Sequence, residues 1–185
     1  VPGAFMSMVG MNALNNIVSR GITQANLILD ELHREIRTSL SQEETGNADG
    51  MDMALCIIRE DEKKIEFAGA KNPLVYIQNG ETYKVKADVN PIGGGKYSTV
   101  KPFTKHTIDV HVDTTVYLFS DGYQDQFGGP KNKKFMSKNF RTLLSEIHHL
   151  SMDDQRIKLD ETIEGWMEST KQTDDILVVG FKVMA

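Results

Sequence analysis

The hydrophobic pattern of the chain predicts an α+β fold, in which antiparallel strands are flanked by α-helices. Apolar residues recur at helical spacing over the first 40 residues, form short strand-like segments up to residue 119, and return to helical spacing between residues 140 and 167. The strand-like segments follow one another through turns without intervening helices, which argues against repeated βαβ units. A chain of 185 residues can bury one sizeable core, so residues 1–185 are expected to form a single domain.

Two amphipathic helices are expected at the start of the chain. The first covers residues 1–20, with Pro2 in its first turn and Gly21 as its stop. The stripe expected to face the core comprises Phe5, Met8, Val9, Asn12, Leu14, Ile17 and Val18. Thr23 is expected to cap the second helix, and its buried face comprises Ala25, Ile28, Leu29, Leu32, Ile36 and Leu40. A polar loop is expected over residues 41–50.

Strands are expected from residue 53 onward. Residues 53–58 form a continuous apolar run, which is typical of a strand covered on both faces, and residues 64–68 follow after a charged turn. The segments 74–78 and 81–86 flank Asn79-Gly80, a dipeptide typical of two-residue hairpins.

The stretch 87–105 is expected to be a mobile flap, because Pro91, three glycines at 93–95 and Pro102 interrupt any regular pattern. Two further strands, 106–112 and 115–119, are expected after it.

The C-terminal part predicts two helices and a last strand. A third helix is indicated by Phe140, Leu143, Leu144 and Ile147. Ser151 and Asp154 form a capping pattern for a fourth helix, whose apolar residues are Leu159, Ile163, Trp166 and Met167. The apolar run 176–183 is expected to be the last strand.

The charge balance limits the partners that the chain can bind. The formal net charge is −5, so no basic excess is present to bind nucleic acid or an anionic membrane surface. No stretch approaches the roughly 20 apolar residues of a membrane span, and no signal peptide precedes the first helix. One basic cluster fits a solvated surface better than a docking patch for an acidic partner; it comprises Lys131, Lys133, Lys134, Lys138 and Arg141.

The lone Cys56 lies inside an apolar strand-like segment. A buried structural thiol is therefore favoured over a nucleophile, and a reducing compartment, the cytoplasm, is expected.

Several short motifs fail when their positions are counted. The run 93–96 lacks the first glycine of a phosphate-binding loop, and Tyr97 stands where Ser or Thr is required. Cys56 occupies the place of the bidentate Glu in an EF-hand register that begins at Thr45. Phe119 stands where a haloacid dehalogenase phosphatase has its nucleophilic Asp. The five His residues show no zinc-ligand spacing.

Two acidic turns at strand ends form the strongest candidate site. Asp121 and Gly122 follow the apolar run 116–119, and Asp174 and Asp175 precede the apolar segment 176–179. Each turn alone is most simply structural. Together, carboxylates aimed rigidly from the rims of buried strands suit a hard divalent cation, and adjacent carboxylates tolerate each other best beside one. The pair therefore predicts a metal site.

Five sequence blocks occur in the order Val1–Met8, Asp49–Leu55, Phe67–Pro73, Leu118–Gly122 and Thr173–Ile176. Together they resemble the stage II sporulation protein E type of metal-dependent serine/threonine phosphatase, the bacterial relatives of protein phosphatase 2C. The resemblance covers nearly the whole chain. It implies a four-layer αββα fold, with two antiparallel sheets packed face to face between helices.

The resemblance also implies roles for the residues of the acidic turns. Asp121 and Asp174 match metal ligands of the family, and Asp175 is a further ligand or a neighbouring acceptor. Gly122 would let the backbone turn sharply beside the metals. The implied cofactors are two Mn²⁺ or Mg²⁺ ions, which activate a water for in-line attack on phosphoserine or phosphothreonine.

In the family, an Asp-x-x-Gly-His-Gly segment directly precedes the block that begins this chain and supplies further metal ligands. The resemblance thus implies that residues 1–185 are a fragment of the domain, without its first strands and first metal motif, and inactive by itself. Open strand edges then predict self-association.

The implied substrate is a phosphorylated partner protein, for instance an anti-sigma-factor antagonist. The domain would be the output part of a larger cytoplasmic sensor protein. The alternative function is a catalytically inactive, phosphatase-like interaction module that binds a partner through residues 131–141 or the stretch 87–105.

Overall fold

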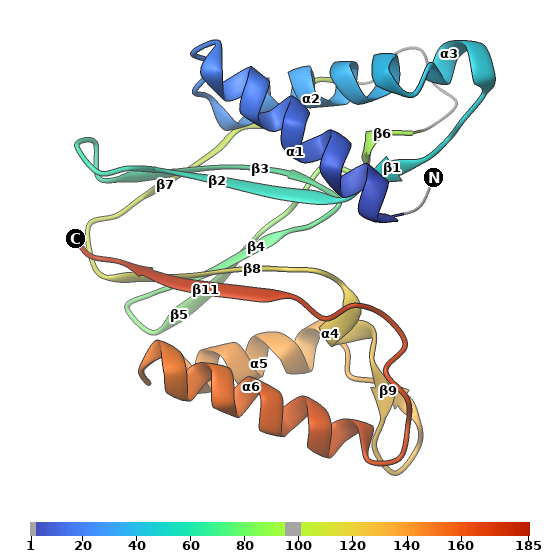
Figure 1. The fold of residues 1–185 in the computed structure, drawn as a ribbon. Coiled ribbons are helices and arrows are strands. Elements are labelled where there is room, and N and C mark those ends of the chain that lie inside the picture. Colours follow the sequence, from blue (N-terminus) through green and yellow to red (C-terminus); the bar gives the residue numbers. More distant parts are fainter. Residues whose placement is uncertain (1–2, 95–100) are drawn as a thin grey trace. The chain divides into compact units, whose positions relative to one another are not determined.

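The computed structural model describes residues 3–94 and 101–185, which form two compact units. The first unit contains residues up to 73 together with 85–109, and the second contains residues 74–84 and 110–185. Antiparallel sheets with helices occur in both units (Figure 1), so the predicted α+β class is confirmed.

In the first unit, helices lie on one face of a three-stranded sheet (Figure 1). The helices are α1 (Gly3–Ser19), α2 (Ala25–Ser39) and α3 (Gln42–Thr45). The sheet has the order β2-β3-β7, formed by β2 (Met53–Arg59), β3 (Lys64–Ala70) and β7 (His106–Asp109). A separate short ribbon pairs β1 (Gly50–Met51) with β6 (Ile92–Gly93). The core of this unit includes Ile17, Leu29, Leu32, Ile36 and Ala68.

In the second unit, two helices lie on one face of a four-stranded antiparallel sheet (Figure 1). The sheet has the order β11-β8-β4-β5, formed by β4 (Leu74–Gln78), β5 (Glu81–Val85), β8 (Thr114–Phe119) and β11 (Val178–Val183). The other elements are α4 (Gly122–Asp125), β9 (Phe127–Gly128), β10 (Lys133–Lys134), α5 (Ser137–Ile147) and α6 (Met152–Met167). Aromatic rings fill much of the core, with Tyr123 packed on Phe140 at a centroid distance of 4.6 Å.

Two turn predictions are confirmed. Asn79 and Gly80 both have positive φ values, 50° and 74°, as a type I′ hairpin turn requires. Ser151 caps α6, because its Oγ accepts a hydrogen bond from the Asp154 backbone N–H at 3.1 Å.

The predicted buried stripe of α1 is wrong for Phe5, Met8 and Val18, which are at least half exposed. The buried residues of this helix are Met6, Gly10, Ala13 and Ile17. Apolar residues occur almost all around α1, so periodicity alone does not select its buried side. The side of α1 that carries Gly10 is buried because the Met51 side chain packs against it. A Cβ on Gly10 would lie 2.8 Å from Met51 Cε.

Thr23 does not cap α2. The N-cap residue is Gln24, whose side chain makes no capping bond, and the backbone N–H of Ala25 donates instead to Glu66 on β3 at 3.4 Å. A tertiary carboxylate thus replaces the local cap. The expected loop 41–50 contains the short helix α3.

The strand β2 is less buried than predicted. Its residues are mostly half-buried and Ile58 is 44% exposed; β2 lies at the end of its sheet. The predicted flap is also partly wrong. Gly93 belongs to β6 and Phe103 is only 3% exposed, so both are packed, while residues 95–100 lie outside the described part of the chain.

Candidate functional site

The first acidic turn leaves the buried strand β8. Phe119 is 5% exposed, and Ser120 and Asp121 then emerge at the end of the sheet. Asp121 is the N-cap residue of α4, and its backbone carbonyl accepts from the Asp125 N–H at 2.9 Å. Its exposed carboxylate makes no capping bond to that helix.

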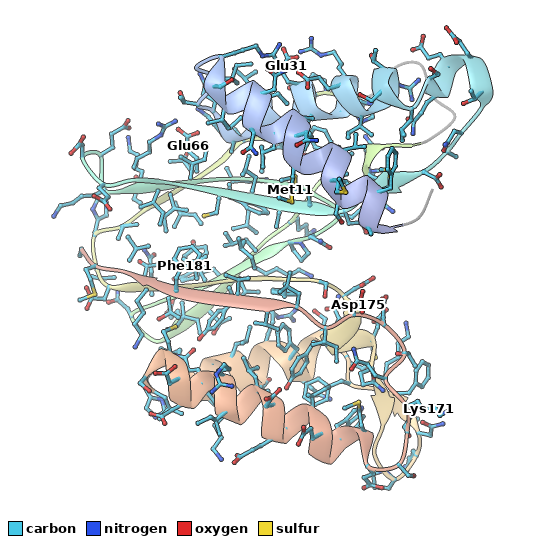
Figure 2. All side chains as sticks on the ribbon, in the orientation of Figure 1. Met11, Glu31, Glu66, Lys171, Asp175 and Phe181 are labelled. Atoms are coloured by element: carbon cyan, nitrogen blue, oxygen red, sulfur yellow. The ribbon has the colours of Figure 1, made fainter. Side chains whose placement is uncertain are left out.

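The second acidic turn enters β11, and Figure 2 labels Asp175 there and Lys171 earlier in the same loop. The Oδ1 atom of Asp174 accepts from the Asp175 backbone N–H at 2.7 Å, and the Asp174 carbonyl accepts from the Gln172 side chain at 2.7 Å. Both Asp side chains are exposed. The turn is thus internally ordered, with both carboxylates at the surface.

Ser120 joins the two acidic turns directly. Its hydroxyl donates to the Asp175 carbonyl at 3.0 Å and accepts from the Leu177 N–H at 3.1 Å. The Ser120 N–H donates to the Leu177 carbonyl at 3.0 Å, which continues the β8–β11 pairing by one residue. The sequence places these turns more than 50 residues apart, and the sheet brings them side by side.

Gly122 permits this close approach. A Cβ on Gly122 would lie 2.3 Å from the Asp175 carbonyl oxygen, a distance that no side chain tolerates. Gly122 begins the helix α4 and is not among the glycines with positive φ, so close contact with the second turn, rather than a sharp bend, requires glycine here.

The described residues supply part of a metal site. Asp121, Asp174 and Asp175 offer carboxylate oxygens, the ligands preferred by Mg²⁺ and accepted by Mn²⁺. Within residues 3–94 and 101–185, however, no group of three or more His, Cys, Asp or Glu side chains is arranged to hold a metal ion. The carboxylates are therefore ligands of the right chemistry for Mg²⁺ or Mn²⁺, but the described residues do not bring enough of them together to form a complete site.

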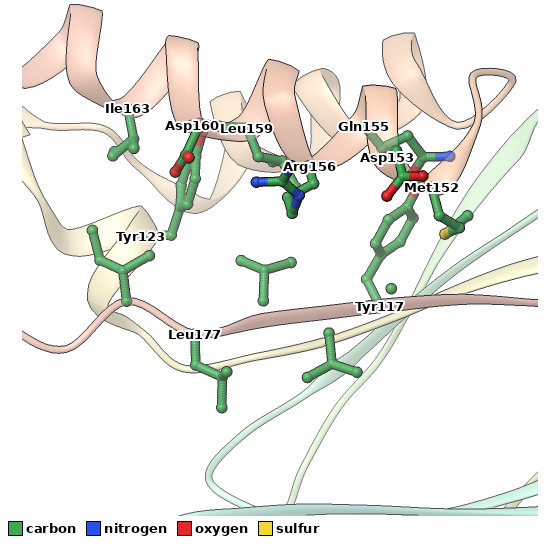
Figure 3. A pocket seen from close by; sticks show the side chains of 14 residues that line it. Tyr117, Tyr123, Met152, Asp153, Gln155, Arg156, Leu159, Asp160, Ile163 and Leu177 are labelled. Atoms are coloured by element: carbon green, nitrogen blue, oxygen red, sulfur yellow. Dashed lines mark hydrogen bonds between the residues drawn. The ribbon is translucent and has the colours of Figure 1, made fainter.

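A cavity of about 530 Å³ lies in the same unit, between α6 and β11 (Figure 3). Tyr117 and Tyr123 line it, and their hydroxyls donate to Gln155 Oε1 at 2.7 Å and to the Leu159 carbonyl at 2.8 Å. Burial raises the pKa of both tyrosines, so they stay neutral. Neither Asp121 nor Asp174 lines the cavity, which is therefore distinct from the acidic turns.

Sequence reasoning missed two residues of this region, Ser120 as a link and Gln126. Gln126 is completely buried, and its side chain contacts the loop that carries Asp174. A single glutamine in a polar stretch carries no signal for such a role, because its partners in that loop lie more than 40 residues away.

Known proteins resemble this chain over almost its whole length. The family model described as stage II sporulation protein E (SpoIIE) matches residues 1–184. The SiaA-PP2C domain of Pseudomonas aeruginosa is similar at 28% identity and a TM-score of 0.88, over 99% of this chain and 71% of that chain. No curated protein sequence gives a match.

Two further solved structures are similar in fold. The phosphatase domain of the cell fate determinant SpoIIE from Bacillus subtilis matches at 17% identity and a TM-score of 0.53, over 95% of this chain and 74% of that chain; a Mn-presoaked structure of it also matches. The RsbU and RsbW domains of Rv1364c from Mycobacterium tuberculosis match at 15% identity and a TM-score of 0.66, over 92% of this chain and 45% of that chain.

The family match covers almost every residue, and two of the similar structures are described as a PP2C domain and a phosphatase domain. The chain therefore belongs to the stage II sporulation protein E (SpoIIE) family of protein phosphatase 2C-type, metal-dependent serine/threonine phosphatases.

Proposed function

We propose that Asp121 and Asp174 are metal ligands of a phosphatase domain that removes phosphate from phosphoserine or phosphothreonine on a partner protein. The observation that carries this proposal is the direct contact between the two acidic turns, made by Ser120 and Gly122 against Asp175. Two carboxylates from distant parts of the sequence are thereby kept at one end of one sheet.

The residues of the chain suit Mn²⁺ or Mg²⁺, two ions in the intact domain. When bound, such ions lower the pKa of a coordinated water and stabilise charge on the phosphoryl oxygens. The protein's part is to hold Asp121 and Asp174 in place and to leave their carboxylates exposed. The Asp175 carbonyl is engaged by Ser120, so Asp175 offers its side chain as a further ligand or as an acceptor for bound water.

We infer that the remaining ligands come from outside these 185 residues, in the first strands and first metal motif of the domain. The lack of a three-ligand cluster among the described residues supports this, as does the match to only 71% of the SiaA-PP2C chain. The chain on its own is then a fragment with little or no phosphatase activity.

The partner class is also part of the proposal. The substrate we propose is a phosphorylated regulatory protein, such as an anti-sigma-factor antagonist. A fold relative, Rv1364c, carries RsbU and RsbW domains in one protein. No helix in the described residues is long and apolar enough to cross a membrane. Burial raises the pKa of the Cys56 thiol to about 12, so the thiol stays protonated and does not act as a nucleophile. The location we propose is the cytoplasm.

The test is Mn²⁺-dependent hydrolysis of a phosphoserine or phosphothreonine peptide by the complete domain. Asp121→Asn is expected to lower kcat/KM by at least about a hundredfold, because a neutral amide replaces a charged ligand. The matched control is Asp125→Asn, one helical turn away, whose partly exposed carboxylate pairs with Lys134 at 2.8 Å; it should change kcat/KM by less than about twofold.

Unaltered activity of Asp121→Asn would contradict the assignment of the metal ligand. Robust Mn²⁺-dependent turnover by the 185-residue chain alone would contradict only the inference that further ligands are needed.

A further inference from the structure

Gln126 is a completely buried polar side chain whose hydrogen bonds lead to the Asp174 loop. Its Oε1 accepts from the Thr173 backbone N–H at 3.1 Å. Its Nε2 donates to the Lys171 carbonyl at 3.1 Å and to the Phe127 carbonyl at 3.0 Å. Both ends of the amide are therefore satisfied, which fixes the orientation of the side chain in the protein interior.

The backbone around Gln126 is also held in place by tertiary contacts. Its backbone carbonyl accepts from Trp166 Nε1 at 3.1 Å and from the Phe135 N–H at 2.9 Å. The Gly129 N–H donates to the Trp166 carbonyl at 2.8 Å, and the Phe135 ring packs edge-on against the Trp166 ring. Residues 126–135 are thus attached to the C-terminal end of α6.

Gln126 is linked to both acidic turns, to one through the backbone and to the other through hydrogen bonds. The short helix α4 leads from Asp121 to Gln126, and Thr173, which Gln126 binds, directly precedes Asp174. On the other side of the same turn, Ser120 binds the Asp175 carbonyl and the Leu177 N–H. The Asp174 turn is therefore anchored at both of its ends to the segment that carries Asp121.

We infer that Gln126 is a positioning residue, which sets the place of Asp174 relative to Asp121 and thereby the affinity of the site for Mn²⁺ or Mg²⁺. This inference rests on the proposed function, in which both aspartates are metal ligands. Ser120 alone anchors only the β11 side of the turn, so loss of the Gln126 contacts leaves residues 171–173 without their anchor and lets Asp174 sample positions that do not bind metal.

The decisive variant is Gln126→Met, which keeps the volume of the side chain and removes its hydrogen bonds. In the complete domain, titration calorimetry should give a Mn²⁺ dissociation constant about 10-fold or more above that of the wild type, the range found when groups that orient ligands are removed. Saturating Mn²⁺ should restore most of kcat, because no reacting group is changed.

The matched control is Gln155→Met. Gln155 is equally a buried glutamine of the second unit, 2% exposed, and bonds the Tyr117 hydroxyl and the carbonyls of His148 and Leu150. The Gln155→Met variant should lower the melting temperature about as much as Gln126→Met does, and it should leave the Mn²⁺ affinity unchanged. Equal Mn²⁺ affinity in Gln126→Met and Gln155→Met would overturn the inference.

A second readout needs no metal. Amide hydrogen exchange at Thr173 in the metal-free complete domain should accelerate in Gln126→Met and not in Gln155→Met; equal rates would contradict the inference. If Gln126→Met does not fold, Gln126→Glu keeps the acceptor for Thr173, and its affinity deficit relative to wild type should shrink as the pH falls and the carboxyl regains a donor. A deficit independent of pH would count against it.

Failure of the inference remains distinguishable from failure of the proposed function. If Asp121→Asn in the complete domain leaves Mn²⁺ affinity unchanged, the metal assignment itself fails. If Asp121→Asn abolishes Mn²⁺ binding and Gln126→Met does not weaken it, only the positioning role fails.

Discussion

His33 is a buried histidine that binds a backbone group far away in the sequence. It is 6% exposed, and its Nδ1 accepts from the Gly93 N–H at 3.1 Å. Asp30 and Arg37, on the same helix, are its charged neighbours, and the Phe103 ring packs edge-on against it. The acceptor role requires a neutral ring, and burial lowers the pKa of His33 below its ordinary value of 6.5.

This histidine predicts a pH dependence of stability. Between pH 6.5 and the lower pKa of folded His33, the unfolded chain binds more protons, so the free energy of unfolding should fall as the pH drops below 6.5. His33→Asn keeps an acceptor at the Nδ1 position and does not titrate, so its urea-unfolding free energy should depend less on pH from 7.5 to 5.5. The exposed His111→Asn is the control and should retain the wild-type slope; an identical slope in His33→Asn would refute the prediction.

Individual buried polar residues were beyond sequence reasoning. His33 and Gln126 meet their partners across 60 and 47 residues of sequence, and Gln42 accepts from Gly94 across 52. Periodicity reports which face of an element is apolar, and it is silent about which polar side chain a tertiary contact buries. Asp121 and Asp174 stood out in the sequence because each lies within a few residues of an apolar strand-like run; their role as ligands stays a prediction.

At the scale of elements, local signals succeeded where the stabilising contact is itself local. The hairpin at Asn79-Gly80 and the cap of α6 each involve residues at most three positions apart. The predictions for the cap of α2 and for the buried side of α1 were wrong, because both depend on residues of later strands. Glu66 lies on β3 and Met51 on β1.

The cap of α6 predicts a measurable loss. Ser151→Ala should lower the free energy of unfolding by about 1 kcal/mol, because the Asp154 N–H then loses its acceptor at the helix start. Ser151→Gly should cost only a few tenths of a kcal/mol. Urea unfolding measures both, with the exposed Ser169→Ala as the control. An unchanged midpoint for Ser151→Ala would show that the cap is not stabilising.

At the scale of the whole molecule, the chain has apolar surface and a strand edge that predict self-association. β11 ends its sheet, and among the described residues it pairs only with β8. Leu177 and Val179 are 60% and 45% exposed there, and Met8 and Met11 on α1 are 63% and 65% exposed. An unprotected edge with apolar neighbours favours pairing with another chain.

Light scattering should therefore give a mass above the 20.7 kDa of one chain at high concentration. Val179→Lys, which places a charge on the edge strand, should weaken the association by about tenfold or more. Val89→Lys, at an 85% exposed position outside the strands, is the control and should leave it unchanged. A monomeric mass at all concentrations would contradict the prediction.

The sequence by itself determined the order of the longer helices and strands, the positions of the two acidic turns and the family, because these depend on periodicity, capping patterns and motifs within a few neighbouring residues. Only the tertiary structure decided which side of α1 is buried, that Ser120 and Gly122 join the acidic turns, and that Gln126 anchors the loop before Asp174. These features depend on groups tens of residues apart, whose meeting is an outcome of strand pairing and packing rather than of any local pattern.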